Sequence, residues 1–582
     1  MSGPGHPPTS DGSTIGGGDA DGPSGLHRAL SALGVLLVVI AVAWRARFGI
    51  SFFDDGYNAS LPLRLALGAR PFVDEMTPQL LGFLIPALFA RAWHALFGLA
   101  GLVLALRLLY VAAATAVGAV VYRTLRPTVP FAGAHLAAAA PLLAPPYNIL
   151  GLTYNTTVLL AYLLAWALAL RAGQTGSRRI AAAAGVAAAI GAIAYPPVAL
   201  GAVVLLATFV AMRETRRLTP AALLGAGAVL VVFGAWLLAN ARPADVLAAF
   251  AYSSSVLEGV LEPADRFWAI AENLRDTLLT PWLIPMWLLA VVASVRNRAG
   301  SGIRLATLLL PAAAFLPNII ALRLPPGVDF PHFGVQAGSY IIALTAGLAL
   351  PVLAWHRRAE DERARRMLVL AFPVSITNML AVAYFTSAGW HWAVPAIGLA
   401  PLAAALVAGW ALACRDDADL NGTLVLPVVA AGVILGLLVL LYGSTFKDDP
   451  PLTLSHTLRE PAVLGIVTHA EQAERIEVVA EIGRRQVAPN EGVLFVHGQL
   501  GYVLVDAPMV TNAVWLATGP TDAESVAYFE RTGRWPDVVF VSLSLVESLG
   551  PSGVADDPLL GRLNTDYDSV EVGGGFVVYR LR

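Results

Sequence analysis

The sequence is poor in charged residues and nearly devoid of cysteine. Asp, Glu, Lys and Arg make up only 13% of its 582 residues, about half the share of a typical soluble protein. The one cysteine, Cys414, excludes an internal disulfide and any metal site built from several thiolates. A formal net charge of -2 gives no reason to expect nucleic-acid binding. Hydrophobic residues make up 57% of the chain. This composition indicates an integral membrane protein.

Three regions follow one another along the chain. Residues 1–26 are rich in Gly, Ser, Pro and Asp, and they predict a disordered cytoplasmic tail. Residues 27–442 carry the apolar stretches of a polytopic α-helical membrane domain with about thirteen spans. The predicted spans are 29–50, 99–121, 131–147, 152–170, 180–196, 197–212, 218–240, 278–295, 303–322, 337–355, 367–387, 392–413 and 423–442. From residue 443 the hydropathy falls, and 443–582 predict a small soluble domain.

The distribution of arginine orients the spans. With the N-terminus in the cytoplasm, every inner loop is basic, as the positive-inside rule requires. The apolar stretch 78–98 breaks this pattern if it is counted as a span, so we expect it to be a re-entrant or juxtamembrane helix. The outer segments 51–98 and 241–278 hold most of the loop carboxylates, and 241–278 has the spacing of amphipathic helices. Any chemistry is therefore expected on the outer face.

The C-terminal region has the pattern of an extracytoplasmic α/β domain. Short apolar runs at 493–498, 502–508, 537–544 and 575–581 predict buried strands. Helical patterns at 469–485 and 521–533 lie between them. An odd number of spans places this domain outside, together with the acidic loops.

Two adjacent carboxylates, Asp54 and Asp55, follow the first span. Like charges this close raise the pKa of one group unless a cation or a metal compensates. A carboxylate near the membrane plane can serve as the general base for a hydroxyl when the other substrate is borne by a lipid. The alternative is a solvated loop in which Asp begins the next helix, since Asp favours that position.

The wider pattern around these carboxylates resembles the GT-C class of membrane glycosyltransferases, in its protein O-mannosyltransferase and aminoarabinose lipid A transferase branch. The resemblance rests on Phe53, Asp54, Asp55, Tyr57, Leu65, Gly68, Pro71, Asp74, Thr77, Pro78 and Arg107. It implies transfer of a sugar from a polyprenyl-phosphate donor with inversion. By position, Asp54 matches the catalytic aspartate of the family, and Asp55 stands where the family usually has Glu. Either Asp74 or Glu75 matches a second acidic position.

A phosphate leaving group also calls for positive charge, and the planar guanidinium of arginine suits it. The candidates on the outer side are Arg64, Arg70, Arg107, Arg242, Arg266, Arg275 and Arg323, and His332 lies in the same loop as Arg323. His391, which lies between two tryptophans, is a candidate substrate contact. Tyr57, which belongs to the loop motif, is another. Arg323 at a helix end and the tryptophans beside His391 are equally typical of a membrane interface. An outer turn with Tyr147, Asn148, Tyr154 and Asn155 offers groups for sugar hydroxyls.

We therefore expect a plasma-membrane glycosyltransferase that needs no cofactor. Asp54 and Asp55 with an acidic partner are an alternative site for one divalent cation. The expected donor is a polyprenyl-phosphate arabinofuranose or mannose, and the acceptor is a glycan, glycolipid or protein of the cell envelope. Two other functions stay open: a transporter or flippase of a lipid-linked saccharide, and a non-catalytic scaffold of envelope assembly.

Overall fold

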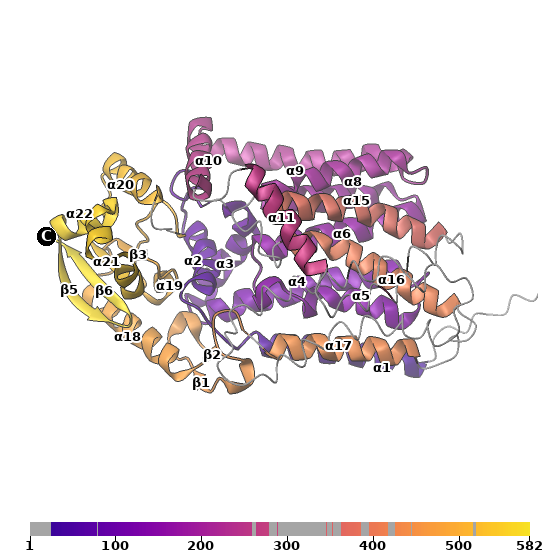
Figure 1. Cartoon of the computed structure of the whole chain (residues 1–582), viewed down its shortest axis with the longest axis horizontal. Helices are drawn as coiled ribbons and strands as arrows, with labels where there is room; N and C mark the ends of the chain where they lie inside the picture. Colours follow the sequence, from indigo (N-terminus) through magenta and orange to yellow (C-terminus); the bar gives the residue numbers. More distant parts are fainter. Residues whose placement is uncertain are drawn as a thin grey trace, which may run out of the picture.

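The computed structural model consists of a long helical bundle with a smaller α/β domain at one end (Figure 1). It describes residues 25–77, 79–258, 263–278, 362–385, 395–416, 425–443, 445–515 and 520–582, together with positions 288, 345 and 352. The helices of the bundle are α1 (Gly25–Arg45), α4 (Leu102–Leu125), α5 (Phe131–Leu143), α6 (Tyr154–Thr175), α7 (Arg178–Ala194), α8 (Ala199–Ala211), α9 (Thr219–Asn240), α15 (Glu362–Phe385), α16 (Ala400–Asp416) and α17 (Val425–Gly443).

Hydropathy and length qualify several of these helices as membrane spans. Among the described residues, six segments are long and apolar enough: Leu80–Phe97, Leu102–Leu125, Tyr154–Thr175, Arg216–Asn240, Glu362–Phe385 and Ala396–Ala413. Shorter apolar helices, α1 and α17 among them, lie alongside. The prediction of a polytopic helical membrane protein with a small C-terminal α/β domain is confirmed. The number of thirteen spans stays a prediction, because the predicted spans 278–295, 303–322 and 337–355 fall almost wholly outside the described residues.

Small residues let the helices of the bundle approach closely. On α7, a Cβ added to Gly185 would lie 1.9 Å from the carbonyl oxygen of Ala222. On α9, a Cβ added to Gly225 would lie 2.0 Å from the carbonyl oxygen of Ala182. Such reciprocal contacts are typical of membrane helices, where close van der Waals packing holds neighbours together. Helix α6 runs through the centre, and its Trp166 side chain is fully buried.

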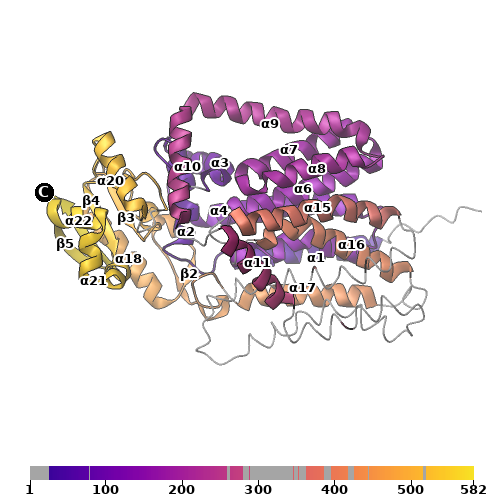
Figure 2. The same ribbon diagram turned by 45° about the horizontal axis from the view of Figure 1, so that its top comes forward.

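Four helices belong to the two predicted outer segments. They are α2 (Asp54–Ala66), α3 (Leu84–Phe97), which follows a 3-10 turn at Leu80–Phe83, α10 (Pro243–Glu258) and α11 (Pro263–Leu278). Both views place α2, α3 and α10 at the end of the bundle that faces the C-terminal domain (Figure 2). By length and composition Leu80–Phe97 also qualifies as a span; its relation to the membrane as a re-entrant or juxtamembrane helix stays a prediction. The helical pattern predicted for 241–278 corresponds to α10 and α11, and α11 exposes Phe267 and Trp268.

The C-terminal domain is built on a mixed four-stranded sheet. Its strands are β3 (Val493–Val496), β4 (Val538–Ser542), β5 (Tyr567–Gly573) and β6 (Phe576–Leu581), in the order β3-β4-β6-β5. Strand β3 is parallel to β4, and the other neighbours are antiparallel. A separate short ladder joins β1 (His456–Thr457) to β2 (Val467–Thr468). The helices are α18 (Ala470–Gln486), α19 (Gly501–Leu504), α20 (Pro520–Thr532), α21 (Leu543–Asp556) and α22 (Pro558–Asp566).

One predicted strand is wrong, and three strands of the described chain, β1, β2 and β5, were not predicted. The run 502–508 forms the end of α19 and a loop, because a short apolar run fits a buried helical turn as well as a strand. Strand β5 lies at the edge of the sheet and is mostly exposed, so its residues lack the apolar run of a buried strand. The strands predicted near 493–498, 537–544 and 575–581 correspond to β3, β4 and β6.

The first outer loop and the C-terminal domain share one hydrophobic core. Phe52, Tyr57 and Leu61 belong to the same buried cluster as Val496 and Phe540. Backbone bonds join the two parts directly: Leu500 N donates to Phe52 O at 2.8 Å, and Met76 N donates to Asn512 O at 2.7 Å. The chain after residue 443 is thus docked on the first loop by packing and by hydrogen bonds.

Substituting Gly56 tests this docking. A Cβ at position 56 would lie 2.1 Å from the backbone nitrogen of Leu500, and backbone cannot move aside as a side chain can. We expect Gly56→Ala to lower the free energy of unfolding by about 2 kcal/mol or more, measured by thermal unfolding in detergent. Gly227→Ala on α9, where a Cβ meets nothing within 4 Å, is the matched control. Equal unfolding temperatures for Gly56→Ala and the wild type would contradict the close contact.

Candidate functional site

Asp54 lies at the start of α2, where the bundle meets the C-terminal domain. Its Oδ2 is 2.7 Å from the Nζ of Lys447, which lies in the segment between α17 and β1. Burial raises the pKa of Asp54 above its ordinary value, although Lys447 acts in the opposite direction. A carboxylate of raised pKa in a partly buried position has the properties of a general base.

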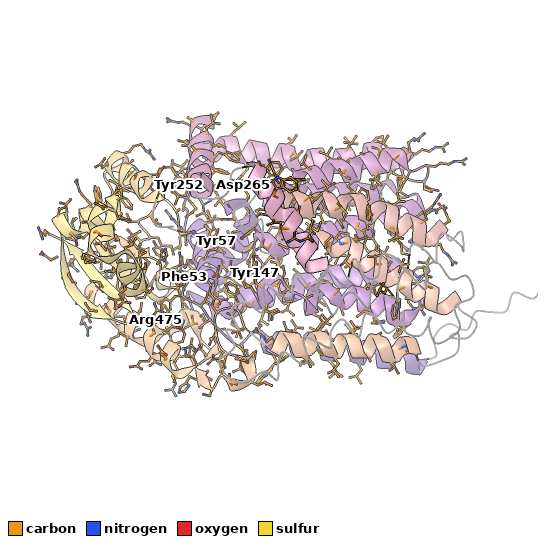
Figure 3. The ribbon with its side chains drawn as sticks, in the orientation of Figure 1. Phe53, Tyr57, Tyr147, Tyr252, Asp265 and Arg475 are labelled. Atoms are coloured by element: carbon orange, nitrogen blue, oxygen red, sulfur yellow. The ribbon has the colours of Figure 1, made fainter. Side chains whose placement is uncertain are left out.

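Aromatic side chains surround this ion pair. The ammonium of Lys447 lies 5.2 Å from the ring centre of Phe53 and 5.1 Å from that of Phe446. The ring of Phe446 packs edge-on against Tyr147 at 5.5 Å, and Phe53 packs against His497 at the same distance. Figure 3 labels Phe53 and Tyr147 at the boundary between the bundle and the C-terminal domain. The ion pair therefore has apolar rings beside it, which strengthen its electrostatic interaction.

Three buried tyrosines lie within electrostatic reach of Asp54: Tyr57, Tyr147 and Tyr154. Tyr57 is buried, with its ring 5.1 Å from those of Phe83 and Trp515, and its hydroxyl is 3.5 Å from Gln79 Oε1. Burial raises the pKa of Tyr57 and of Tyr147 well above the ordinary value, and the charge of Asp54 adds to both shifts. Both hydroxyls therefore keep their protons and can donate hydrogen bonds.

Backbone strain gathers in the same place. Five non-glycine residues with positive φ occur in the described chain: Phe72, Tyr147, Asn148, Lys447 and His497. Of these, Tyr147, Lys447 and His497 belong to the surroundings of Asp54 described above, and Asn148 adjoins Tyr147. Such conformations cost free energy and persist where the surrounding structure enforces them, often at functional sites.

Asp55 forms an ion pair with Arg107, whereas its neighbour Asp54 forms one with Lys447. Its Oδ1 is 2.7 Å from Arg107 Nη2, and its Oδ2 accepts a hydrogen bond from Ser51 N at 2.9 Å. Arg107 also donates to the carbonyls of Ala46 and Gly49, at 2.9 and 2.7 Å. All these groups are buried, so Asp55 and Arg107 together fasten the loop after α1 to α4. In this structure both terminal nitrogens of Arg107 are bound to protein acceptors, and Asp55 positions the loop that carries Asp54.

Arg64 and Glu75 form a second buried ion pair. Arg64 Nη1 lies 2.8 Å from Glu75 Oε2, and their side chains are 5% and 0% exposed. Glu75 accepts further hydrogen bonds from Thr77 and from the backbone nitrogen of Val514, and Arg64 donates to the carbonyl of Thr511. Burial raises the pKa of Glu75 against the effect of Arg64. The pair joins the first loop to the C-terminal domain, which places both residues in a structural connection.

Asp74 lies at the rim of the loop. It accepts hydrogen bonds from the backbone and the side chain of Arg70, at 2.8 and 3.1 Å. Partial burial acts to raise the pKa of Asp74, but the hydrogen bonds and the charge of Arg70 outweigh it, and the pKa lies below its ordinary value. Asp74 is therefore ionised at neutral pH and bound to a partner from its own turn.

Three predicted contacts, Arg323, His332 and His391, lie outside the described residues. Lys447 was missed as a site residue. The signal that could have found it is its rarity, because it is the single lysine among 38 basic residues. Among the described residues, no group of three or more His, Cys, Asp and Glu side chains is placed to hold a metal ion.

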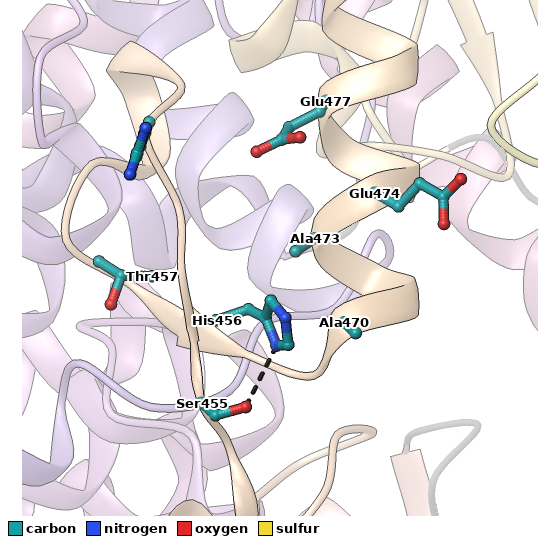
Figure 4. A pocket seen from close by; sticks show the side chains of 8 residues that line it. Ser455, His456, Thr457, Ala470, Ala473, Glu474 and Glu477 are labelled. Atoms are coloured by element: carbon teal, nitrogen blue, oxygen red, sulfur yellow. Dashed lines mark hydrogen bonds between the residues drawn. The ribbon is translucent and has the colours of Figure 1, made fainter.

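A hollow of about 590 Å³ lies elsewhere on the C-terminal domain, between β1 and α18. Its lining includes His456, Arg459, Glu474 and Glu477, and Ser455 Oγ is 3.2 Å from His456 Nδ1 (Figure 4). None of its lining residues comes from the first loop. It is therefore separate from the surroundings of Asp54.

Comparison with known proteins gives a distant likeness along the whole chain. No family model matches the sequence, and no curated protein matches it. Two solved structures of ArnT from Cupriavidus metallidurans, one in the apo state and one bound to undecaprenyl phosphate, are similar to it. They have 14% and 16% sequence identity, both with a TM-score of 0.39, over 95% of this chain and 97% of theirs. ArnT is an aminoarabinose lipid A transferase of the GT-C class, the branch that the loop motif resembles.

Removing the carboxylate of Asp54 and removing that of Asp55 should have different effects on the free energy of unfolding. Asp55→Asn leaves Arg107 buried without its charged partner, and we expect a loss of about 3 kcal/mol or more. Because the pKa of Asp54 is raised on folding, its ionised form is less favourable in the folded protein than in the unfolded one at neutral pH. Asp54→Asn should therefore leave stability unchanged or slightly raised. Thermal unfolding of both variants at pH 7 measures the difference, and equal losses would contradict the division of roles.

Proposed function

We propose that this protein is an inverting glycosyltransferase that moves a sugar, arabinofuranose or mannose, from a polyprenyl-phosphate donor. The acceptor is a hydroxyl of a cell-envelope glycan, lipid or protein on the outer face of the plasma membrane. The observation that carries the proposal is Asp54: a partly buried carboxylate of raised pKa, at the end of the membrane bundle, beside a cation and two protonated tyrosines.

In the proposed reaction, Asp54 accepts the proton of the acceptor hydroxyl while the acceptor oxygen forms a bond to the anomeric carbon. The bond between this carbon and the phosphate oxygen breaks, and its electron pair leaves with the polyprenyl phosphate. Attack from the side opposite to the leaving group inverts the anomeric configuration. Tyr57 and Tyr147 are suited to hold the sugar, since a tyrosine offers an apolar ring face and a hydroxyl donor.

Two buried ion pairs hold the loop that carries Asp54 without touching the reacting atoms. Asp55 and Arg107 hold the loop at the membrane, and Arg64 and Glu75 hold it against the C-terminal domain. Arg323, His332 and His391 stay proposed contacts of the donor or acceptor. We propose transfer without a metal, because Lys447 and Arg107 already neutralise the two carboxylates that a cation would need.

Loss of the carboxylate at position 54 should abolish transfer. Purified protein in detergent is given radiolabelled polyprenyl-phosphate mannose or arabinofuranose and a crude envelope-glycan acceptor. We expect transfer by the wild type and a fall of about 100-fold or more for Asp54→Asn, because a general base contributes that much. Asp568→Asn, which removes an exposed carboxylate from edge strand β5, is the control and should transfer at the wild-type rate. Undiminished transfer by Asp54→Asn would assign the base to another residue.

The pH dependence of the reaction should carry the signature of the same group. Asp54 accepts a proton only when ionised, and its pKa is raised by burial. The value of kcat/KM should therefore fall as the pH drops through this raised pKa, with a midpoint above about 3.9, the ordinary value of Asp. A pH profile of the wild type from acid to neutral measures the midpoint. A midpoint at or below the ordinary value would contradict Asp54 as the base.

A further inference from the structure

Lys447 is a partly exposed cation at the end of the helical bundle. It follows α17, the last helix of the bundle, by only a few residues. Its side chain is 44% exposed, whereas the Asp54 side chain that it binds is 19% exposed. The ammonium is therefore the more accessible half of the pair, and it can reach a new partner without unpacking the core.

Other described cations beside the first loop have partners other than Asp54, and Arg70 at the rim of the loop is paired with Asp74. Arg107 binds Asp55 and backbone carbonyls, and Arg64 binds Glu75 and backbone carbonyls. Arg475 stacks on Phe52 and donates to the carbonyl of Gly574 at 3.0 Å. Withdrawing Arg107 or Arg64 would leave a buried carboxylate and buried carbonyls unpaired, which is costly. Withdrawing Lys447 from Asp54 breaks one partly exposed ion pair.

We propose that Lys447 is a latch on the catalytic base, released by the phosphate of the lipid donor. In the resting protein its ammonium neutralises Asp54. When the donor binds, the ammonium bonds a phosphate oxygen instead, and Asp54 is left as an uncompensated carboxylate beside the acceptor. This inference rests on the proposed function and identifies which group recognises the donor phosphate and how the base is kept inactive without it.

The chemistry of the exchange favours this order of events. Asp54 and the phosphate are both anions and compete for one ammonium. As the bond to the sugar breaks, negative charge grows on the phosphate, so the interaction with Lys447 strengthens toward the transition state. The rings of Phe53 and Phe446 face the same ammonium from 5.2 and 5.1 Å, and cation–π attraction keeps it near the site during the exchange.

Competition for Lys447 predicts opposite effects of two substitutions on lipid binding. The probe is decaprenyl monophosphate in detergent micelles, titrated into purified protein and followed by intrinsic tryptophan fluorescence. We expect Lys447→Met to weaken binding by about tenfold or more, since a charge-assisted bond is lost. We expect Asp54→Asn to tighten binding by about threefold or more, because the phosphate no longer competes with a carboxylate. The double variant should bind as weakly as Lys447→Met alone.

Several controls keep the test specific. Lys447→Arg retains the positive charge and should bind within a few-fold of the wild type. Arg484→Met, which breaks an exposed ion pair with Glu460, should bind as the wild type does, and thermal unfolding checks that all variants are folded. Inorganic phosphate should bind far more weakly than the lipid; equal binding would overturn the assignment to a lipid phosphate. Unchanged or weaker binding by Asp54→Asn, or undiminished binding by Lys447→Met, would overturn the latch.

The latch and the proposed function can fail separately. Binding of decaprenyl monophosphate requires no sugar and no turnover. The expected binding pattern without any sugar transfer would support the exchange of partners at Lys447 and contradict the glycosyltransferase function. Transfer that depends on Asp54, with binding indifferent to Lys447, would contradict the latch and leave the function standing.

Discussion

The buried ion pair between Asp55 and Arg107 fixes the point at which the chain leaves the first membrane helix. Arg107 donates hydrogen bonds to the carbonyls of Ala46 and Gly49 as well as to the carboxylate of Asp55. The backbone carbonyls at the end of α1 that have no partner within the helix are therefore bound inside the protein. This arrangement turns Asp55 inward and leaves Asp54 beside Lys447 at the start of α2. Two carboxylates that would otherwise repel each other are thereby divided between two cations, a buried Arg107 and a partly exposed Lys447.

The C-terminal domain also holds the first outer loop in place. The aromatic and aliphatic core of its sheet continues into the first loop, and Arg64 and Glu75 tie the loop to the carbonyl of Thr511 and the amide of Val514. His497, which follows β3, packs on Phe53 directly before Asp54. The domain thus forms one wall of the candidate site. A substrate bound at Asp54 would lie between a membrane bundle on one side and an α/β surface on the other.

Hydropathy predicted the membrane helices, and the short apolar runs predicted three of the four strands in the main sheet, because burial in lipid or in a sheet leaves a local pattern. The run 502–508 was misassigned because burial alone does not distinguish a helical turn from a strand. The loop motif placed Asp54 in the candidate site. Its partner Lys447 is 393 positions away, and no local pattern records such a contact. The same limit hid the carbonyl and carboxylate partners of Arg107, and its contact with a donor phosphate stays a prediction.

The solitary lysine has a practical consequence for the chemistry of the whole molecule. Reagents that acylate amines will find a single lysine side chain in this sequence, that of Lys447. An ammonium held in an ion pair reacts slowly, since only the neutral amine is nucleophilic, whereas a released side chain reacts faster. Slow acylation at this one position in intact membranes would therefore show that the ammonium is held by an anion, whether that anion is Asp54 or a lipid phosphate.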